Sequence, residues 1–147
     1  MNVNKYFDKI YIITMKKNKE RHKYIRKLFL KYKIINYEFI YGIEGEKINT
    51  RVMLEKKYID KKMINLPNPI GTILTHKDAW QKMIDNNLNN CVFFEDDVFF
   101  LKEFNINFNN FMESVPNDWS VLQFGQLPAN FRYNNVNQKD EKINKYV

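Results

Sequence analysis

The chain has 147 residues, a mass of 17.9 kDa and a net charge of +7, from 24 lysines and arginines against 17 aspartates and glutamates. This length fits one domain, and 44% hydrophobic residues can fill its core, which argues against a disordered chain. The single cysteine, Cys91, excludes a disulfide scaffold and multi-cysteine metal sites, and four glycines in this arrangement form neither a Walker A loop nor a GxGxxG turn.

The longest apolar runs, residues 10–15 and 91–94, are too short to cross a bilayer. The first residues are polar and charged, without the pattern of a secretory signal. The sequence therefore predicts a cytoplasmic protein with no membrane span. Its positive charge favours anionic partners without choosing among them.

The first 41 residues predict a β–α–β unit. Residues 9–15 are almost continuously apolar and β-branched, which is typical of a strand covered on both faces in a parallel sheet. Asn18 is in place to cap a helix over residues 19–32, whose apolar residues recur at i, i+3, i+4 and i+7. A second strand over residues 37–41 then pairs parallel to the first through a right-handed crossover.

The next part of the chain predicts two helices. Thr50 is expected to cap a short one, which Pro67 and Pro69 would end. A longer helix is expected over residues 71–87, where apolar side chains recur on one side.

Beyond residue 90, strands and helices continue to alternate. Residues 91–94 predict a strand, the aromatic residues between 104 and 112 a helix, and residues 119–124 another strand. The whole pattern predicts an α/β fold with an open, mostly parallel sheet of about four or five strands flanked by helices. Residues 1–128 are interpreted as the domain and residues 129–147, which are polar and aperiodic, as a tail.

The acidic triplet Glu95-Asp96-Asp97 follows the third predicted strand at its carboxyl end, where open α/β sheets bind ligands. In an extended chain Glu95 and Asp97 project to one side and Asp96 to the other. Two carboxylates about 5 Å apart repel by roughly 3 kcal/mol at an effective dielectric constant of 20, so the triplet needs a cation or hydrogen-bond donors. One interpretation is a Mg²⁺ or Mn²⁺ ion bridging to a nucleotide diphosphate. The alternative is a solvated acidic turn that caps a helix.

A second polar group precedes the triplet by one helix and one strand. Thr72, Thr75 and His76 are expected in the N-terminal turn of the helix over residues 71–87, where hydroxyls, an imidazole and free N–H groups would meet an anion. The simpler interpretation is that His76 is a surface or hydrogen-bonded core histidine. Trp80 is likewise expected in the core rather than as a platform for sugar stacking.

Together, these features resemble a known family. The segment GTILTHKDAWQKMIDNNLNNCVFFEDDVFF is similar to the glycosyltransferases of family 25, in which a Gly and a Ser-His pair open a helix and the following strand ends in Glu-Asp-Asp. The family includes bacterial lipooligosaccharide galactosyltransferases and collagen hydroxylysine galactosyltransferases. KIYIITMKKNKER, YEFIYGIEG and DWSVLQFG are similar to elements that flank this block, so the resemblance extends over residues 8–125.

The resemblance implies a GT-A fold that uses a UDP-sugar and a divalent metal, commonly Mn²⁺, with Mg²⁺ as the other candidate. It makes Asp97 the expected direct metal ligand, with Glu95 as the second metal-site residue. Contact with the donor is expected from Asp96, Thr75, His76, Ile12, Thr14 and Arg21.

The implied reaction moves a hexose, galactose or glucose, from the UDP-sugar to a hydroxyl of a saccharide or hydroxylysine-type acceptor, with inversion. The catalytic base is not identified, because family members continue beyond the last matched element. One alternative is therefore a truncated or inactive member that binds UDP-sugar without turnover. Another is a basic nucleic-acid-binding module built on residues 16–33, whose simpler explanation is the solvated face of an amphipathic helix.

Overall fold

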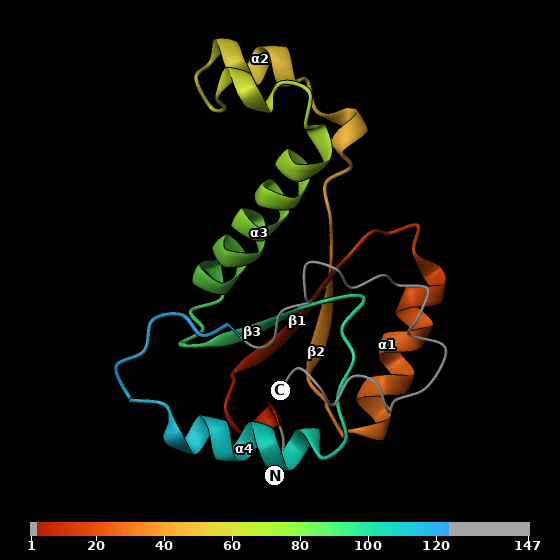
Figure 1. Cartoon of the computed structure of the whole chain (residues 1–147), viewed down its shortest axis with the longest axis vertical. Helices are drawn as coiled ribbons and strands as arrows, with labels where there is room; N and C mark the ends of the chain where they lie inside the picture. The colour runs from red at the N-terminus through yellow and green to blue at the C-terminus, as the bar shows by residue number, and fades with distance from the viewer. Residues whose placement is uncertain (1–2, 124–147) are drawn as a thin grey trace. The chain divides into compact units, whose positions relative to one another are not determined.

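The computed structural model describes residues 3–123 (Figure 1). Contacts divide the chain after Val115, and the helices and strands described below all belong to the part that precedes this division. Residues 116–123 form no regular helix or strand, so the strand predicted from residue 119 is wrong for residues 119–123. Phe124 and the predicted tail over residues 129–147 lie outside the described residues.

The sheet has three parallel strands in the described part of the chain, rather than four or five. These are β1 (Lys9–Thr14), β2 (Tyr37–Tyr41) and β3 (Cys91–Glu95), in the order β2-β1-β3. Ile12 in the central strand is aligned with Phe39 on one side and Phe94 on the other. The predicted α/β fold with a parallel sheet flanked by helices is therefore confirmed.

The helices connect and flank these strands. The α-helices are α1 (Lys19–Lys31), α2 (Thr50–Glu55), α3 (Pro67–Asp85) and α4 (Phe104–Ser114), and the short 3₁₀ helices are η1 (Val3–Lys5), η2 (Gly45–Lys47) and η3 (Lys61–Met63).

Helices α1 and α3 meet opposite faces of the sheet. On one face, Phe29 of α1 packs edge-on against Phe94, with ring centroids 5.7 Å apart. Its neighbour Phe93 points to the other face, where it stacks on Tyr11. The Lys82 ammonium of α3 lies 5.7 Å from the centre of that Tyr11 ring. The central strand is thus covered on both sides, as its apolar sequence predicts.

Helix α3 begins earlier than predicted. Pro67 and Pro69 lie in its first turn instead of ending the preceding helix, because the first turn of a helix leaves N–H groups unpaired and tolerates residues that lack them. Helix α2 is capped by Asn49, whose side chain accepts from the Val52 N–H, and not by Thr50.

Two glycines allow α3 to approach the loop after β2 closely. A Cβ atom on Gly71 would lie 2.6 Å from the Ile43 carbonyl oxygen, and one on Gly45 would lie 2.6 Å from the Pro67 carbonyl carbon. Backbone therefore packs directly on backbone here. This contact also sets the position of Thr75, which follows Gly71 by one helical turn.

Candidate functional site

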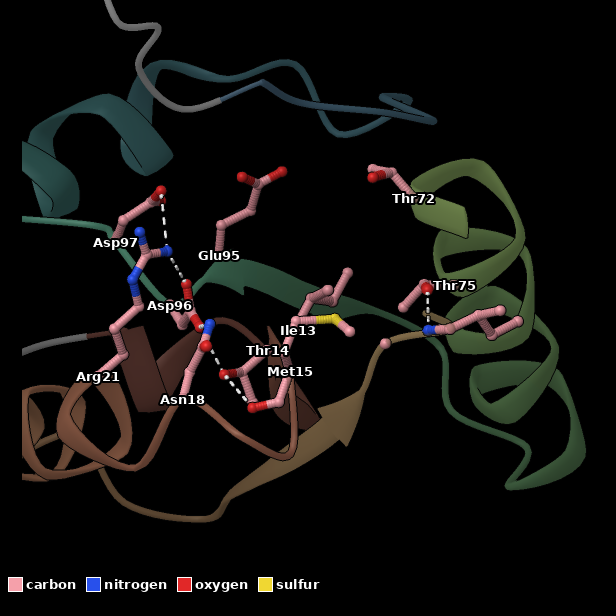
Figure 2. Close-up of a pocket in the computed structure, with 12 residues that line it drawn as sticks. Ile13, Thr14, Met15, Asn18, Arg21, Thr72, Thr75, Glu95, Asp96 and Asp97 are labelled. Atoms are coloured by element: carbon pink, nitrogen blue, oxygen red, sulfur yellow. Dashed lines mark hydrogen bonds and ion pairs between the residues drawn. The ribbon is translucent and has the colours of Figure 1, made fainter. Parts of the chain in front are cut away.

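A pocket of about 240 Å³ opens at the carboxyl ends of β1 and β3, the edge at which open α/β sheets bind ligands. In Figure 2 the acidic triplet and the residues after β1 lie on one side of this pocket, and Thr72 and Thr75 of α3 lie on the other. Its lining residues are Ile13, Thr14, Met15, Asn18, Arg21, Gly42, Ile43, Thr72, Thr75, Glu95, Asp96 and Asp97.

Asp96 is the buried member of the triplet, with 5% of its surface exposed. Its carboxylate accepts hydrogen bonds from Thr14 Oγ1 (2.5 Å), Asn18 Nδ2 (3.1 Å) and Arg21 Nη1 (2.5 Å), all drawn in Figure 2. Burial by itself would raise the pKa of Asp96, but these three hydrogen bonds and the positive charge of Arg21 outweigh it and hold the pKa below its ordinary value. Hydrogen-bond donors from the protein, one of them the cationic guanidinium of Arg21, therefore compensate this carboxylate.

Behind Thr14 lies a buried histidine that the sequence analysis did not single out. His22 Nε2 is 3.1 Å from Thr14 Oγ1 and 3.1 Å from the Met15 carbonyl oxygen. The carbonyl only accepts, and the one hydroxyl proton of Thr14 is already donated to the carboxylate of Asp96. His22 Nε2 must therefore carry a proton and donate to both oxygens, which forms a chain of hydrogen bonds from His22 through Thr14 to Asp96.

The other two carboxylates are more accessible. Asp97 Oδ2 lies 3.4 Å from Arg21 Nη1, so one guanidinium bridges Asp96 and Asp97. Glu95 is exposed and, in Figure 2, points away from Asp96. Glu95 Oε1 lies 3.8 Å from His76 Nε2. The triplet is therefore divided between one anchored carboxylate and two that face the pocket opening.

On the α3 side, Thr75 is held in place on both sides of its hydroxyl. Thr75 Oγ1 donates to the Gly71 carbonyl (2.7 Å) and accepts from the Ile43 N–H (2.9 Å). Thr75 is buried, and its hydroxyl fixes the loop after β2 against α3. A Ser or Thr at this position supplies the same two bonds.

The structure brings most of the predicted site residues together. The pocket lining includes Thr14, Arg21, Thr75 and the acidic triplet. Ile12 does not belong to this lining and is fully buried in the central strand. His76 is not in the lining but contacts Glu95, which is. Because α3 begins at Pro67, His76 lies in the middle of this helix and not in its first turn. The expected helix N-terminus that would bind an anion at His76 is therefore wrong.

Trp80 is 56% exposed, so the expectation that it belongs to the core is also wrong. Its ring centroid lies 6.2 Å from that of His76. Asn18 occupies the N-cap position of α1 as predicted, but its side chain makes no capping hydrogen bond and donates to Asp96 instead.

The metal site implied by the resemblance fits part of the triplet. Within residues 3–123, no group of three or more His, Cys, Asp or Glu side chains is arranged to hold a metal ion. Both oxygens of Asp96 already accept hydrogen bonds, whereas Glu95 and Asp97 offer carboxylate oxygens at the pocket. Mg²⁺ and Mn²⁺ typically use one or two carboxylates together with substrate phosphates, and this donor set suits that mode.

In residues 3–123, no helix combines the length and the hydrophobicity that crossing a membrane demands. The basic residues 16–33 form α1 and its flanks, and their lysines lie at exposed positions. The helix is therefore amphipathic, with Ile25 and Phe29 buried and the lysines solvated, and nucleic-acid binding by this face stays a prediction.

Comparison with known proteins agrees with the motifs. Residues 7–146 match the model of glycosyltransferase family 25, described as an LPS biosynthesis protein family. The chain is 25% identical to procollagen galactosyltransferase 2 of Mus musculus over 134 residues and to that of Homo sapiens over 135 residues. Each alignment covers 82% of this chain and 21% of the relative, so the chain spans about a fifth of the length of these relatives. Since the family model covers most of its residues, the chain belongs to glycosyltransferase family 25.

Proposed function

We propose that the chain provides the donor-binding part of a glycosyltransferase of the GT-A type, which moves a hexose from a UDP-sugar to a hydroxyl group with the help of Mn²⁺ or Mg²⁺. The observation that supports this most directly is the pocket at the carboxyl ends of β1 and β3, where Glu95 and Asp97 are accessible and Asp96 is anchored. Both relatives are named galactosyltransferases, which favours galactose as the hexose.

The size of the pocket formed by the described residues indicates which part of the donor it holds. Sites for drug-sized ligands enclose about 300–1,000 Å³, and this pocket has about 240 Å³. We therefore assign to it the diphosphate and the metal, which need carboxylates and cationic donors, and not the whole sugar nucleotide. Arg21 lines the pocket and carries the fixed positive charge that a diphosphate requires.

In this proposal Glu95 and Asp97 hold the metal, which would neutralise charge on the departing UDP when bound. Arg21 orients Asp97 through their 3.4 Å contact and, as a residue of the pocket lining, would pair with a phosphate oxygen. Asp96 acts indirectly, because its oxygens are taken up by the residues that fix the end of β1 to the start of α1. An acceptor hydroxyl would attack the anomeric carbon with inversion, and the base that removes its proton is not assigned.

The acceptor is proposed, by family resemblance, to be a saccharide or a hydroxylysine-type hydroxyl. The two named relatives concern procollagen, whereas the family description concerns LPS, so the two acceptor classes stay separate outcomes of the test.

The test is a calorimetric titration of the full chain with UDP and with UDP-galactose, each with and without MnCl₂. We expect Mn²⁺ to tighten binding at least tenfold, and we expect Glu95→Gln/Asp97→Asn to abolish that gain. Glu113→Gln, which removes an exposed carboxylate from α4, is the matched control and should behave as the unmodified chain. Equal binding with and without Mn²⁺, or no binding at all, would contradict the proposal.

The same samples distinguish an active enzyme from a member that binds without turnover. Release of UDP from UDP-galactose is measured with Mn²⁺, alone and in the presence of saccharide or hydroxylysine acceptors. Metal-dependent binding without UDP release would favour the binding-only alternative. Release that depends on one acceptor class would identify that class.

A further inference from the structure

Residues 50–66, here called the basic segment, lie between η2 and α3 and contain α2 and η3. Its five basic residues stand against two acidic ones, which leaves a net charge of +3. Apolar residues are interspersed among them throughout. The basic residues are Arg51, Lys56, Lys57, Lys61 and Lys62, and the acidic ones are Glu55 and Asp60.

Local hydrogen bonds give the basic segment a defined backbone. The Val52 N–H donates to the Asn49 side chain at the start of α2, and the Lys62 N–H donates to Asp60 at the start of η3. Lys57 adopts a left-handed φ of 60°, and the Tyr58 N–H closes the end of α2 on the Met53 carbonyl (2.9 Å). The segment is therefore ordered by contacts within itself, next to the N-terminal end of α3 (Figure 1).

No side chain of the segment is buried, and its five basic side chains are exposed. Neither α2 nor η3, both fully within the described residues, contains a buried residue. Tyr58 is 72% exposed, Leu66 44% and Val52 39%. Within residues 3–123, none of the five basic side chains forms an ion pair. Free cations and exposed apolar groups thus occupy one short stretch of surface.

We propose that the basic segment binds the surface of an anionic lipid bilayer. Such a surface attracts clustered lysines by its negative charge, while aromatic and aliphatic side chains enter the boundary between headgroups and acyl chains. Lysine suits this role because its alkyl stem lies along apolar surface while its ammonium stays at the phosphates. Nucleic acid is the less suitable partner, since only one of the five basic residues is an arginine, the side chain that pairs best with phosphates and base edges.

The first test measures co-sedimentation of the full chain with vesicles of phosphatidylcholine alone or with 30% phosphatidylglycerol, in low and in high salt. The variant Lys56→Gln/Lys57→Gln/Lys61→Gln/Lys62→Gln lowers the net charge from +7 to +3. Each lysine near an anionic surface changes partitioning by about fivefold, so this variant should bind anionic vesicles more than tenfold more weakly. Binding should also weaken in high salt and be absent on neutral vesicles.

The matched control removes four other exposed lysines and gives the same net charge: Lys17→Gln/Lys19→Gln/Lys27→Gln/Lys77→Gln. It should keep most of the binding. Equal loss in both variants would overturn the proposal in favour of unspecific attraction by the whole charged protein. Tighter, salt-sensitive binding to RNA or DNA than to the vesicles would overturn it in favour of nucleic acid.

A second measurement asks whether the apolar side chains enter the bilayer. Tyr58→Cys is labelled with a dye whose emission shifts to the blue in an apolar medium. We expect the native Cys91 to react slowly at pH 7, because burial and the charge of Asp8 raise the pKa of its thiol to about 11. A blue shift with anionic vesicles, and none with the label on an exposed α1 position such as Lys27→Cys, is expected. No shift at Tyr58→Cys would refute the proposed insertion.

Discussion

Replacing Asp96 by asparagine tests whether this carboxylate is an internal anchor. Oδ1 accepts from Arg21, while Oδ2 accepts from Thr14 and Asn18. An asparagine amide has one oxygen and one NH₂ group, so one of the two sides must lose its acceptor. If the NH₂ group faces Arg21, a donor meets a donor, and if it faces the other side, it meets the Asn18 amide and the Thr14 hydroxyl. Asp96→Asn therefore keeps the shape of the side chain but cannot keep its hydrogen bonds.

The expected loss follows from the contacts. Hydrogen bonds to charged groups contribute about 1.5–3 kcal/mol each. Arg21 is about half exposed, which puts its bond at the lower end of that range. The less costly orientation of the amide loses the Arg21 bond, about 1.5 kcal/mol, and weakens the bonds from Thr14 and Asn18 because the acceptor is no longer charged. The free energy of unfolding should therefore fall by about 1.5–3 kcal/mol at pH 7. Asp78→Asn, an exposed position on α3, is the control and should change it by less than about 0.5 kcal/mol.

The pH dependence gives this prediction its sign. The pKa of Asp96 in the folded chain is held below the ordinary value of about 3.9. Its charge therefore stabilises the fold fully above that ordinary value, and the stabilisation is lost as the pH falls through the lower, folded pKa. Urea unfolding from pH 7 down to pH 2 should show the difference between the original chain and Asp96→Asn shrinking below about pH 4. A difference that stays constant with pH, or one below 0.5 kcal/mol at pH 7, would refute the anchoring role.

Two further substitutions test the surroundings of the pocket by the same urea unfolding. Gly71→Ala should destabilise the chain by about 1–3 kcal/mol, because the new Cβ would lie 2.6 Å from the Ile43 carbonyl oxygen. Alanine normally favours a helix, so a gain in stability would contradict the close backbone contact. His22→Leu should cost about 2 kcal/mol, because it leaves Thr14 Oγ1 and the Met15 carbonyl without their donor. His22→Gln, which can place an N–H near Nε2, should recover at least half of that loss, and no recovery would argue against the hydrogen-bond chain.

The three strands of the sheet were predictable because their residues leave few alternatives, unlike residues 119–123, which form no strand. β1 ends one residue before its predicted end, β2 has its predicted bounds, and β3 is longer by one residue. Continuous apolar, β-branched runs of this length suit a strand covered on both faces, and the β–α–β order fixes the parallel pairing. The local pattern thus agrees with the contacts that the sheet makes.

The start of α3 was not predictable from local signals. Pro67 is equally suited to follow one helix or to begin the next. The close backbone contact between Gly71 in α3 and Gly45 in the loop after β2 favours a helix that begins at Pro67. This contact joins parts of the chain that no local sequence pattern connects. The misplacement of His76 in the first turn follows from this one error.

The position of the acidic triplet was predictable, but the role of each carboxylate was not. The alternation of an extended chain separates Asp96 from Glu95 and Asp97, and the burial of Asp96 agrees with it. Its partners Thr14 and Arg21 are separated from it by 82 and 75 positions in the chain. Only the pairing of β1 with β3 brings them together, so no spacing within the motif indicates them.

The charge balance at the pocket gives the metal proposal its physical basis. Three carboxylates and one guanidinium leave a net charge of −2 at the triplet. The donors around Asp96 satisfy its oxygens, and they leave the oxygens of Glu95 and Asp97 as the accessible negative charge. A divalent cation would balance that charge, and a diphosphate would supply the further oxygen ligands that two carboxylates lack. Arg21 is the cation in this balance and contacts both aspartates, so Arg21→Met should leave the pocket more negative. Calorimetry should then show stronger binding of Mn²⁺ alone and weaker binding of UDP. The opposite pattern would show that Arg21 does not pair with phosphate.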